Sequence, residues 1–301
     1  MSKTSREIAS QPACWRRAIE LAAEPITEAA LPPDGALVAV VGCGTSWFMA
    51  HAWAAEREAL GRGPTDAFAA SEFPRDRVYP WVVAISRSGT TSEVLSLLES
   101  LPPQTESVCI TGVAGSPCAR AALRVVLLDF ADEESVVQTR YATTTLVLLK
   151  AHIGADMSGA ASAAEAALAA PLPLDPAAVE QLTFLGTGWT VGLASEAALK
   201  CREAAQLWTE SYPAMEYRHG PIAIAAPGRA VWPFGPLPSG LDAQIEATGA
   251  VLADTAALDP LAALVLAQRF AVAVAEARGL DPDVPRSLTR SVILPPGQAG
   301  R

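Results

Sequence analysis

An apolar strand that runs directly into a hydroxyl-rich loop is the feature that most constrains this chain. Trp81–Ile85 is uncharged and rich in β-branched residues, which predicts a buried strand of a parallel sheet. Ser86–Thr91, here called the anion loop, follows at once, and Ser92–Glu99 then opens a helix. A helix N-terminus after such a loop favours a bound anion, because its N–H groups and dipole point at the ligand. A capped turn that binds nothing would share the pattern, since Ser and Thr are common N-caps.

Strands and helices alternate along the whole chain. Strands are predicted at residues 36–41, 67–71, 81–85, 107–110, 125–128, 182–185, 230–233 and 251–252. Helices are predicted at residues 5–28 (with breaks), 47–60, 92–100, 136–153, 157–170, 191–208 and 261–278. This alternation indicates an α/β fold with parallel sheets.

A weak internal repeat suggests two similar α/β domains in tandem. The turn at Gly186–Gly188 echoes the one at Gly42–Gly44, and each follows a predicted strand. The expected organisation is a helical segment at 1–30, a domain at 31–155, a helix and linker at 156–177, and a second domain with the tail at 178–301.

Composition limits the possible functions. The chain has 301 residues, is 50% hydrophobic and carries a formal charge of −10, which argues against nucleic acid or an anionic membrane as partner. An odd number of cysteines without C-x-x-C spacing, and no apparent signal peptide or transmembrane segment, predict a reduced cytoplasmic protein. We expect no metal and no cofactor: no ligand cluster has metal-site spacing, there is no P-loop, and Trp47 and Val191 stand where a dinucleotide fingerprint needs glycine.

Three charged residues share one face of a predicted helix. Glu196, Lys200 and Glu203 are spaced i, i+4 and i+7. A solvated face with a Glu–Lys pair would look the same and would contribute little to stability. The loop beyond carries His219 before Gly220-Pro221, a constrained turn that could aim the imidazole.

Six motifs, in order, resemble the sugar isomerase (SIS) family, in particular the tandem-SIS isomerase half of glucosamine-6-phosphate synthase. They are V-G-C-G-T-S at 41–46, I-S-x-S-G-x-T at 85–91, E-x-S-V-x-x-T at 133–139, E-x-A-L-K-x-x-E at 196–203, H-G-P at 219–221 and P-R-S-L at 285–288. The resemblance covers essentially the whole chain. It implies two three-layer αβα sandwiches, each with a parallel sheet of about five strands.

The resemblance also implies roles for residues. Glu203 would be the base that moves a proton between C1 and C2 of an open-chain sugar, and His219 would open the sugar ring from the neighbouring subunit of a homodimer. Lys200 and Glu196 would organise the sugar hydroxyls. Substrate and phosphate binding would fall to Cys43, Gly44, Thr45, Ser46, Ser86, Arg87, Ser88, Thr91, Val136 and Arg290.

The implied function is a phosphosugar aldose–ketose isomerase or deaminase that acts on an amino-sugar phosphate through an enediol. Glucosamine-6-phosphate, converted to fructose-6-phosphate and ammonia, is the leading case. A fructosamine-type deglycase and a simple isomerase are alternatives, and the non-enzyme alternative is a regulatory module that binds a sugar phosphate. No segment resembles the synthase's glutaminase domain, so we do not expect glutamine-dependent synthesis. Arg87 replaces a family Gln and could add a phosphate contact, whereas Arg290 replaces a tail Lys and cannot form a Schiff base.

Overall fold

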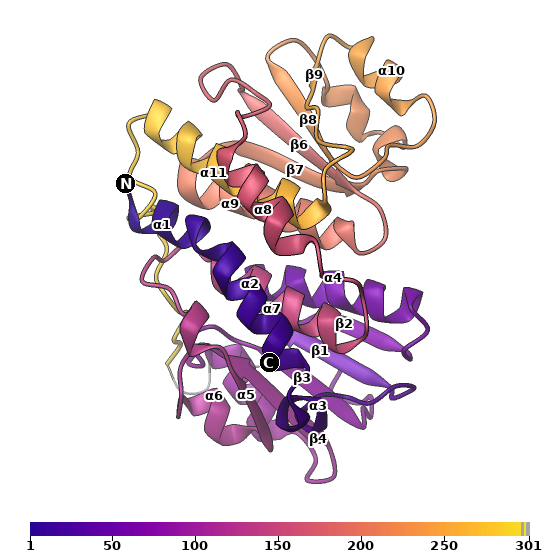
Figure 1. Cartoon of the computed structure of the whole chain (residues 1–301), viewed down its shortest axis with the longest axis vertical. Helices are drawn as coiled ribbons and strands as arrows, with labels where there is room; N and C mark the ends of the chain where they lie inside the picture. The colour runs from indigo at the N-terminus through magenta and orange to yellow at the C-terminus, as the bar shows by residue number, and fades with distance from the viewer. Residues whose placement is uncertain (296–297, 299–301) are drawn as a thin grey trace. The chain divides into compact units, whose positions relative to one another are not determined.

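A computed structural model describes residues 1–295 and 298 and divides the chain into two compact units (Figure 1). The five-stranded unit consists of Ala13–Glu134, Arg140–Ser158 and Thr289–Arg301. The four-stranded unit consists of Met1–Pro12, Ser135–Thr139 and Gly159–Leu288. Each unit is built on its own parallel sheet, which confirms the predicted α/β class.

The sheet of the five-stranded unit has the order β2-β1-β3-β4-β5, with all neighbours parallel. Its strands are β1 (Val38–Gly42), β2 (Thr65–Ala69), β3 (Trp81–Ile85), β4 (Glu106–Thr111) and β5 (Arg124–Leu127). β1 is buried along its whole length and β3 is buried except at Trp81, which explains their uncharged, β-branched sequences.

Helices cover both faces of this sheet, as a three-layer sandwich requires. The helical elements are α2 (Gln11–Ala22), α3 (Pro25–Ala30), α4 (Thr45–Ala59), η1 (Ala70–Glu72), α5 (Ser92–Ser100), α6 (Pro117–Ala121), η2 (Asp129–Ala131) and α7 (Arg140–His152). α4 and α7 pack together on one face, where the Trp53 indole N–H donates to the Leu149 carbonyl at 3.1 Å. α5 and α6 pack on the other face, where Val94, Leu97 and Cys118 join the apolar core (Figure 1).

The four-stranded unit has the strand order β7-β6-β8-β9, again all parallel. Its strands are β6 (Gln181–Gly186), β7 (Trp208–Pro213), β8 (Arg229–Phe234) and β9 (Val251–Leu252). The helical elements are α1 (Lys3–Ala9), α8 (Ala160–Ala169), α9 (Thr190–Ala205), η3 (Glu216–Arg218), η4 (Pro221–Ile224), α10 (Leu241–Glu246) and α11 (Pro260–Ala277). α9 packs on β6 and β7, and α11 packs on α9, while α10 and η3 contribute to a core on the other face.

The structure corrects several sequence-based expectations. The second sheet has four strands among the described residues instead of about five. The helix predicted to reach Trp208 ends at Ala205, because Gln206 takes a left-handed conformation with φ 51°, and strand β7 begins two residues later. β7 was missed because its sequence, WTESYP, is half polar, as suits an edge strand.

The unit boundaries also differ from the expected ones. Residues 1–12 belong to the four-stranded unit, and the residues after Leu288 belong to the five-stranded unit. Sequence order alone could not assign either segment, because the chain crosses between the units more than once.

α11 is the one described helix long and apolar enough to span a bilayer. However, 72% of its 18-residue apolar stretch, Pro260–Ala277, is buried inside the protein. The hydrophobicity of α11 is therefore that of a core helix.

Candidate functional site

The carboxyl ends of β1 and β3 are the natural place for a ligand in the five-stranded unit. β1 and β3 are neighbours in the sheet, but β1 connects through α4 to β2 on one side and β3 connects through α5 to β4 on the other. The chain therefore reverses its winding between them, and ligands of open α/β sheets bind at such a switch point. The loop after β1 (Gly42–Ser46) and the anion loop after β3 both start at this edge.

The loop after β1 is tightly folded. A Cβ at Gly42 would lie 2.6 Å from the Ser46 carbonyl carbon, so only glycine fits there. Gly44 has φ 54° and precedes the first residue of α4, and Thr45 and Ser46 are buried. Burial raises the pKa of the Cys43 thiol to about 12, which keeps it protonated and unsuited to act as a nucleophile.

The anion loop is a compact cluster of hydroxyl groups. Ser86 and Ser88 are buried, and Thr90 and Thr91 are half-buried. The Ser86 and Thr91 hydroxyl oxygens lie 3.4 Å apart. The Thr90 N–H donates to Ser88 Oγ at 3.2 Å, and the Thr90 hydroxyl oxygen lies 3.0 Å from Ser88 Oγ. Gly89 has φ 62°, and a Cβ there would come within 1.9 Å of Ser116 Oγ. The loop therefore gathers several donors beside the N-terminus of α5.

The C-terminal tail, residues Thr289–Pro295, runs along the anion loop. Ser291 Oγ accepts hydrogen bonds from the Ser88 hydroxyl at 3.1 Å and the Thr90 hydroxyl at 3.0 Å. The Ser92 N–H donates to the Val292 carbonyl at 3.1 Å, and its Oγ accepts from the Leu294 N–H at 2.8 Å. Sequence reasoning missed Ser291, because nothing in its neighbours indicates that residues some 200 positions apart would meet.

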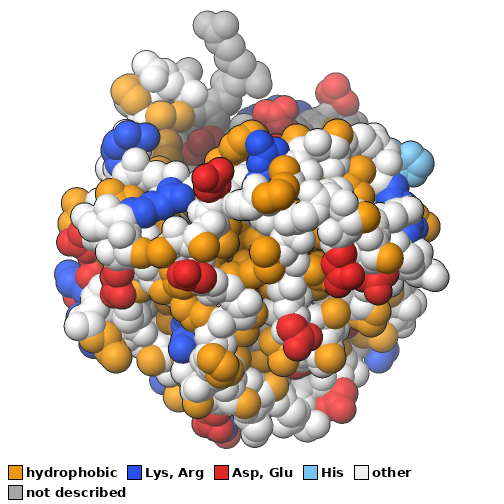
Figure 2. Space-filling view, turned by 90° about the horizontal axis from the view of Figure 1, so that it is seen from above, with side chains coloured by type: hydrophobic (Ala, Val, Ile, Leu, Met, Phe, Trp, Pro, Cys, Tyr) orange, Lys and Arg blue, Asp and Glu red, His pale blue; other side chains and the backbone are white. Residues whose placement is uncertain are grey.

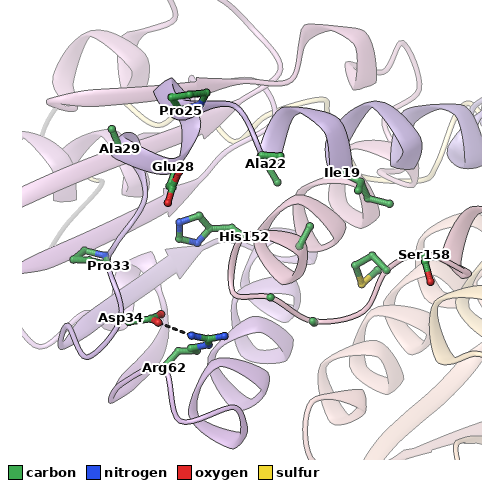
Figure 3. A pocket seen from close by; sticks show the side chains of 15 residues that line it. Ile19, Ala22, Pro25, Glu28, Ala29, Pro33, Asp34, Arg62, His152 and Ser158 are labelled. Carbon is green, nitrogen blue, oxygen red and sulfur yellow. Dashed lines mark hydrogen bonds and ion pairs between the residues drawn. The ribbon is translucent and has the colours of Figure 1, made fainter.

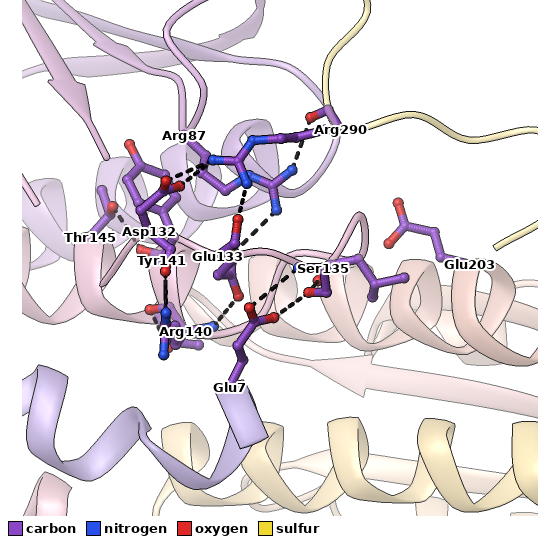
Figure 4. Close-up of polar contacts among 12 residues, drawn as sticks. Glu7, Arg87, Asp132, Glu133, Ser135, Arg140, Tyr141, Thr145, Glu203 and Arg290 are labelled. Atoms are coloured by element: carbon purple, nitrogen blue, oxygen red, sulfur yellow. Dashed lines mark hydrogen bonds and ion pairs between the residues drawn. The ribbon is translucent and has the colours of Figure 1, made fainter. Parts of the chain in front are cut away.

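Arg87 and Arg290, both predicted to contact substrate, are engaged with acidic residues (Figure 4). The Arg87 guanidinium pairs with Glu133 at 3.5 Å, with both side chains almost fully buried, and it donates to the Arg290 carbonyl at 2.9 Å. Arg290 Nη2 lies 2.6 and 2.7 Å from the two carboxylate oxygens of Asp132, and its Nη1 donates to the Glu133 carbonyl. The structure thus joins the anion loop, the turn at Asp132–Glu133 and the tail through charged side chains.

A second charged cluster lies on α9, in the four-stranded unit. Lys200 Nζ is 3.6 Å from Glu196 Oε1 and forms a closer ion pair with Glu203. The Glu196 and Lys200 side chains are buried (0 and 2% exposed), whereas the Glu203 side chain is 19% exposed. Glu203 lines a hollow of about 430 Å³, together with Leu199, Arg202, Gln206, Leu207, Trp208, Arg286 and Leu288. Of the three predicted residues, Glu203 is therefore the one that a ligand in this hollow can reach.

The remaining predicted residues of the four-stranded unit lie outside this hollow. His219 follows η3 and is exposed, with its N–H bonded to the Glu216 carbonyl at 2.9 Å. Val136 lies in the segment Ser135–Thr139 and is half-buried. The structure therefore brings together Glu196, Lys200 and Glu203 in one unit, and Ser86, Arg87, Ser88, Thr91 and Arg290 in the other.

A hollow of about 1080 Å³ lies at a different place in the five-stranded unit (Figure 3). It is lined by parts of α2 and α3, the Asp34–Arg62 ion pair and His152 at the end of α7. No residue of the predicted site lines it. Burial lowers the pKa of the His152 imidazole, which favours its neutral form.

Charged groups are mixed on the surface. Figure 2 shows acidic and basic side chains interspersed among apolar ones over one face. Among the described residues, no three His, Cys, Asp or Glu side chains converge as a metal site would need.

Residues 37–153 match the family model of the SIS domain. This region contains the whole five-stranded sheet and ends after α7, so an SIS domain is confirmed there. Of the four-stranded unit, only Ser135–Thr139 falls within the match, so one SIS domain is confirmed and the second of the two predicted in tandem is not.

The similar proteins of known name include isomerizing glutamine–fructose-6-phosphate aminotransferases. The one from Methanothermobacter thermautotrophicus is 29% identical over 85% of this chain and 51% of its own length. The one from Pseudomonas aeruginosa is 30% identical, also over 85% of this chain and 51% of its own length. The chain thus spans about half the length of these relatives.

Solved structures show the same fold. Glucosamine-6-phosphate deaminase from Thermotoga maritima has a TM-score of 0.82 and 23% identity, covering 97% of this chain and 100% of that one. Tagatose-6-phosphate ketose/aldose isomerase from Escherichia coli has a TM-score of 0.72 and 19% identity, covering 99% and 98%.

Proposed function

From the premise that residues 37–153 form an SIS domain, we propose that the chain is a phosphosugar isomerase or deaminase acting on an amino-sugar phosphate. The leading reaction converts glucosamine-6-phosphate and water to fructose-6-phosphate and ammonia. The names of similar proteins support this class, because they include a deaminase, a ketose/aldose isomerase and isomerizing aminotransferases of sugar phosphates.

The observation that carries the proposal is the exposure of Glu203 beside a buried lysine. A carboxylate that lines a hollow can accept a proton from a ligand, and Lys200 holds it in one orientation. A module that only binds a ligand has no need for a base. Burying a charged lysine is costly unless it is paired, and Lys200 is paired with Glu196 and Glu203. Glu196, which a ligand in the hollow cannot reach, is then a positioning residue for Lys200.

In the proposed mechanism, the hydroxyls of Ser86, Ser88 and Thr91 hold the sugar phosphate, and Thr45 and Ser46 line the pocket. His219 assists ring opening by donating a proton to the ring oxygen. Glu203 removes the proton from C2 of the open-chain sugar and returns it to C1. In a deaminase, the resulting imine at C2 takes up water and releases ammonia, which balances the reaction.

We further propose a cytoplasmic homodimer that shares His219 between subunits. The exposure of His219 in the single chain supports this, since the imidazole is accessible to a second copy. Sugar phosphate is the proposed partner, with no nucleic acid, membrane, metal or cofactor. The function does not require Arg87 or Arg290 to contact the substrate.

A ligand panel followed by turnover tests the proposal. Thermal unfolding would be measured with glucosamine-6-phosphate, fructose-6-phosphate, other sugar phosphates, fructosamine-type phosphates, sulfonated sugars and the unphosphorylated sugars. We expect glucosamine-6-phosphate to raise Tm and to yield fructose-6-phosphate and ammonia in equal amounts. Isomerisation without ammonia would identify a simple isomerase, and release of a substituted amine would identify a deglycase. Binding without turnover of any ligand would identify a regulatory module and refute the enzyme.

A further inference from the structure

Arg87 lies within the anion loop, yet its side chain serves the C-terminal tail. We propose that Arg87 is a positioning residue that, with Asp132 and Glu133, holds the tail against the anion loop and keeps Ser291 where an anion would bind. We call Arg87, Asp132 and Glu133 the clamp. The clamp is argued from contacts among the described residues, whereas the identification of the anion as a sugar phosphate rests on the proposed function.

The first step is the buried contact of Arg87. Its guanidinium and the Glu133 carboxylate are 1% and 0% exposed and lie 3.5 Å apart. Glu133 is itself held from the other side, since its Oε1 accepts the Arg140 N–H at 2.8 Å at the start of α7. The main chain of Arg87 is also fixed, because its carbonyl accepts from the Gly112 N–H at 3.0 Å. Arg87 is therefore a rigid donor.

The second step is the direction of that donor. Arg87 Nη2 donates to the Arg290 carbonyl at 2.9 Å, which fixes the tail main chain one residue before Ser291. The Arg290 side chain adds a second attachment through its two-point contact with Asp132. Figure 4 shows the two guanidinium groups meeting the adjacent acidic residues from the loop and from the tail.

The third step is what the clamp places on the loop. Ser291 Oγ accepts from both the Ser88 and the Thr90 hydroxyls, and it lies 3.5 Å from Thr91 Oγ1. A phosphate oxygen bound there would take hydrogen bonds from the same donors. Ser291 therefore competes with a bound anion, and the tail has to shift at Ser291 before these hydroxyls can bind a ligand.

Limited trypsin digestion followed by intact-mass measurement tests the clamp without any substrate. Cleavage after Arg290 requires its side chain to leave Asp132, whereas Arg286 is exposed and serves as an internal reference. The readout is the early ratio of chains ending at Arg290 to chains ending at Arg286. We expect Asp132→Asn to raise this ratio by about tenfold, because local opening becomes easier when a charged contact is lost.

The role of Arg87 is tested in the same assay. Arg87→Gln leaves Glu133 buried without its cation, which can unfold the chain, so Arg87→Gln/Glu133→Gln is the second variant. Arg124→Gln is the matched control, because Arg124 also pairs with a carboxylate, Glu106, in the same unit. We expect the double variant to raise the ratio several-fold and the control to leave it unchanged. An unchanged ratio in both Asp132→Asn and the double variant would overturn the clamp.

Binding of inorganic phosphate tests the competition. Ser291→Ala removes the internal acceptor while keeping the clamp, so we expect phosphate to bind about fivefold more tightly by calorimetry. Ser100→Ala, a serine in the same unit remote from the tail contacts, is the control. Weaker binding by Ser291→Ala would overturn the competition and make Ser291 a phosphate ligand. If neither the wild type nor Ser291→Ala binds phosphate, the proposed function fails. The digestion ratio still decides whether the clamp holds the tail.

Discussion

Arg290 and Asp132 form a two-point ion pair, with one guanidinium nitrogen 2.6 and 2.7 Å from the two carboxylate oxygens. Both side chains are about one third exposed, so the pair is accessible from solvent. Arg290, which the family resemblance implies would bind the substrate, is paired with a carboxylate of its own unit. A structural role for Arg290 follows from the geometry more directly than a chemical one.

Borohydride trapping should give no adduct at Arg290. A Schiff base needs a neutral amine, and arginine offers a guanidinium instead. We expect Arg290→Ala to raise KM with little change in kcat, because the tail then loses the attachment with which it would enclose a bound substrate after Ser291 has moved aside. Arg290→Lys should remain partly active. Peptide mass mapping after borohydride treatment with fructose-6-phosphate checks the first point. Loss of kcat at unchanged KM in Arg290→Ala would contradict the second.

Glu203→Gln should lower kcat at least about a hundredfold while leaving substrate binding within about tenfold. The amide keeps the shape of the side chain but cannot accept a proton. Glu210→Gln is the matched control, since this carboxylate accepts a hydrogen bond from Tyr212 in the same unit and does not line the hollow. Steady-state kinetics and calorimetry measure the two effects. Turnover of Glu203→Gln within a few-fold of wild type would remove it as the base.

Ser88→Ala should weaken binding of the phosphosugar about tenfold and barely affect the unphosphorylated sugar. Ser88 is the buried centre of the anion loop and would lose its hydrogen bond to a phosphate oxygen. Titration calorimetry with the two sugars measures the difference. If both sugars lose affinity equally, the loop does not recognise the phosphate.

Mixing Glu203→Gln with His219→Ala, each inactive alone, should restore part of the activity. In a dimer that shares His219, a mixed pair contains one site with both wild-type residues. Subunit exchange would be verified by native mass spectrometry of differently tagged chains. Exchange without recovery would mean that each chain supplies its own histidine.

The pH dependence of stability should be shallower in His152→Gln. Burial lowers the pKa of the His152 imidazole from its ordinary 6.5, so the folded state favours the neutral form. This contribution is complete above pH 6.5 and is lost as the pH falls through the lowered folded-state pKa. Urea unfolding between pH 7.5 and about 5 should show less loss of unfolding free energy in the variant than in wild type. His219→Gln, at an exposed histidine, is the control; equal slopes in all three proteins would refute the prediction.

The local patterns of the sequence determined the fold class and the first sheet. Short, uncharged, β-branched runs such as Trp81–Ile85 favour buried strands, and this one is strand β3. The spacing of Glu196, Lys200 and Glu203 likewise fixed one helical face, because helix periodicity is a local property. These features could be predicted without knowing any long-range contact.

Tertiary structure alone decided which charges are accessible and where the tail lies. Arg87 has the same sequence context whether its guanidinium faces a ligand or Glu133, and only packing buries it against the carboxylate. Ser291 meets Ser88 across some 200 residues of chain, a contact that no local pattern can encode. The end of α9 at Ala205 depended on Gln206 adopting a left-handed turn that lets β7 pair with β6, a gain that appears only when the sheet is assembled.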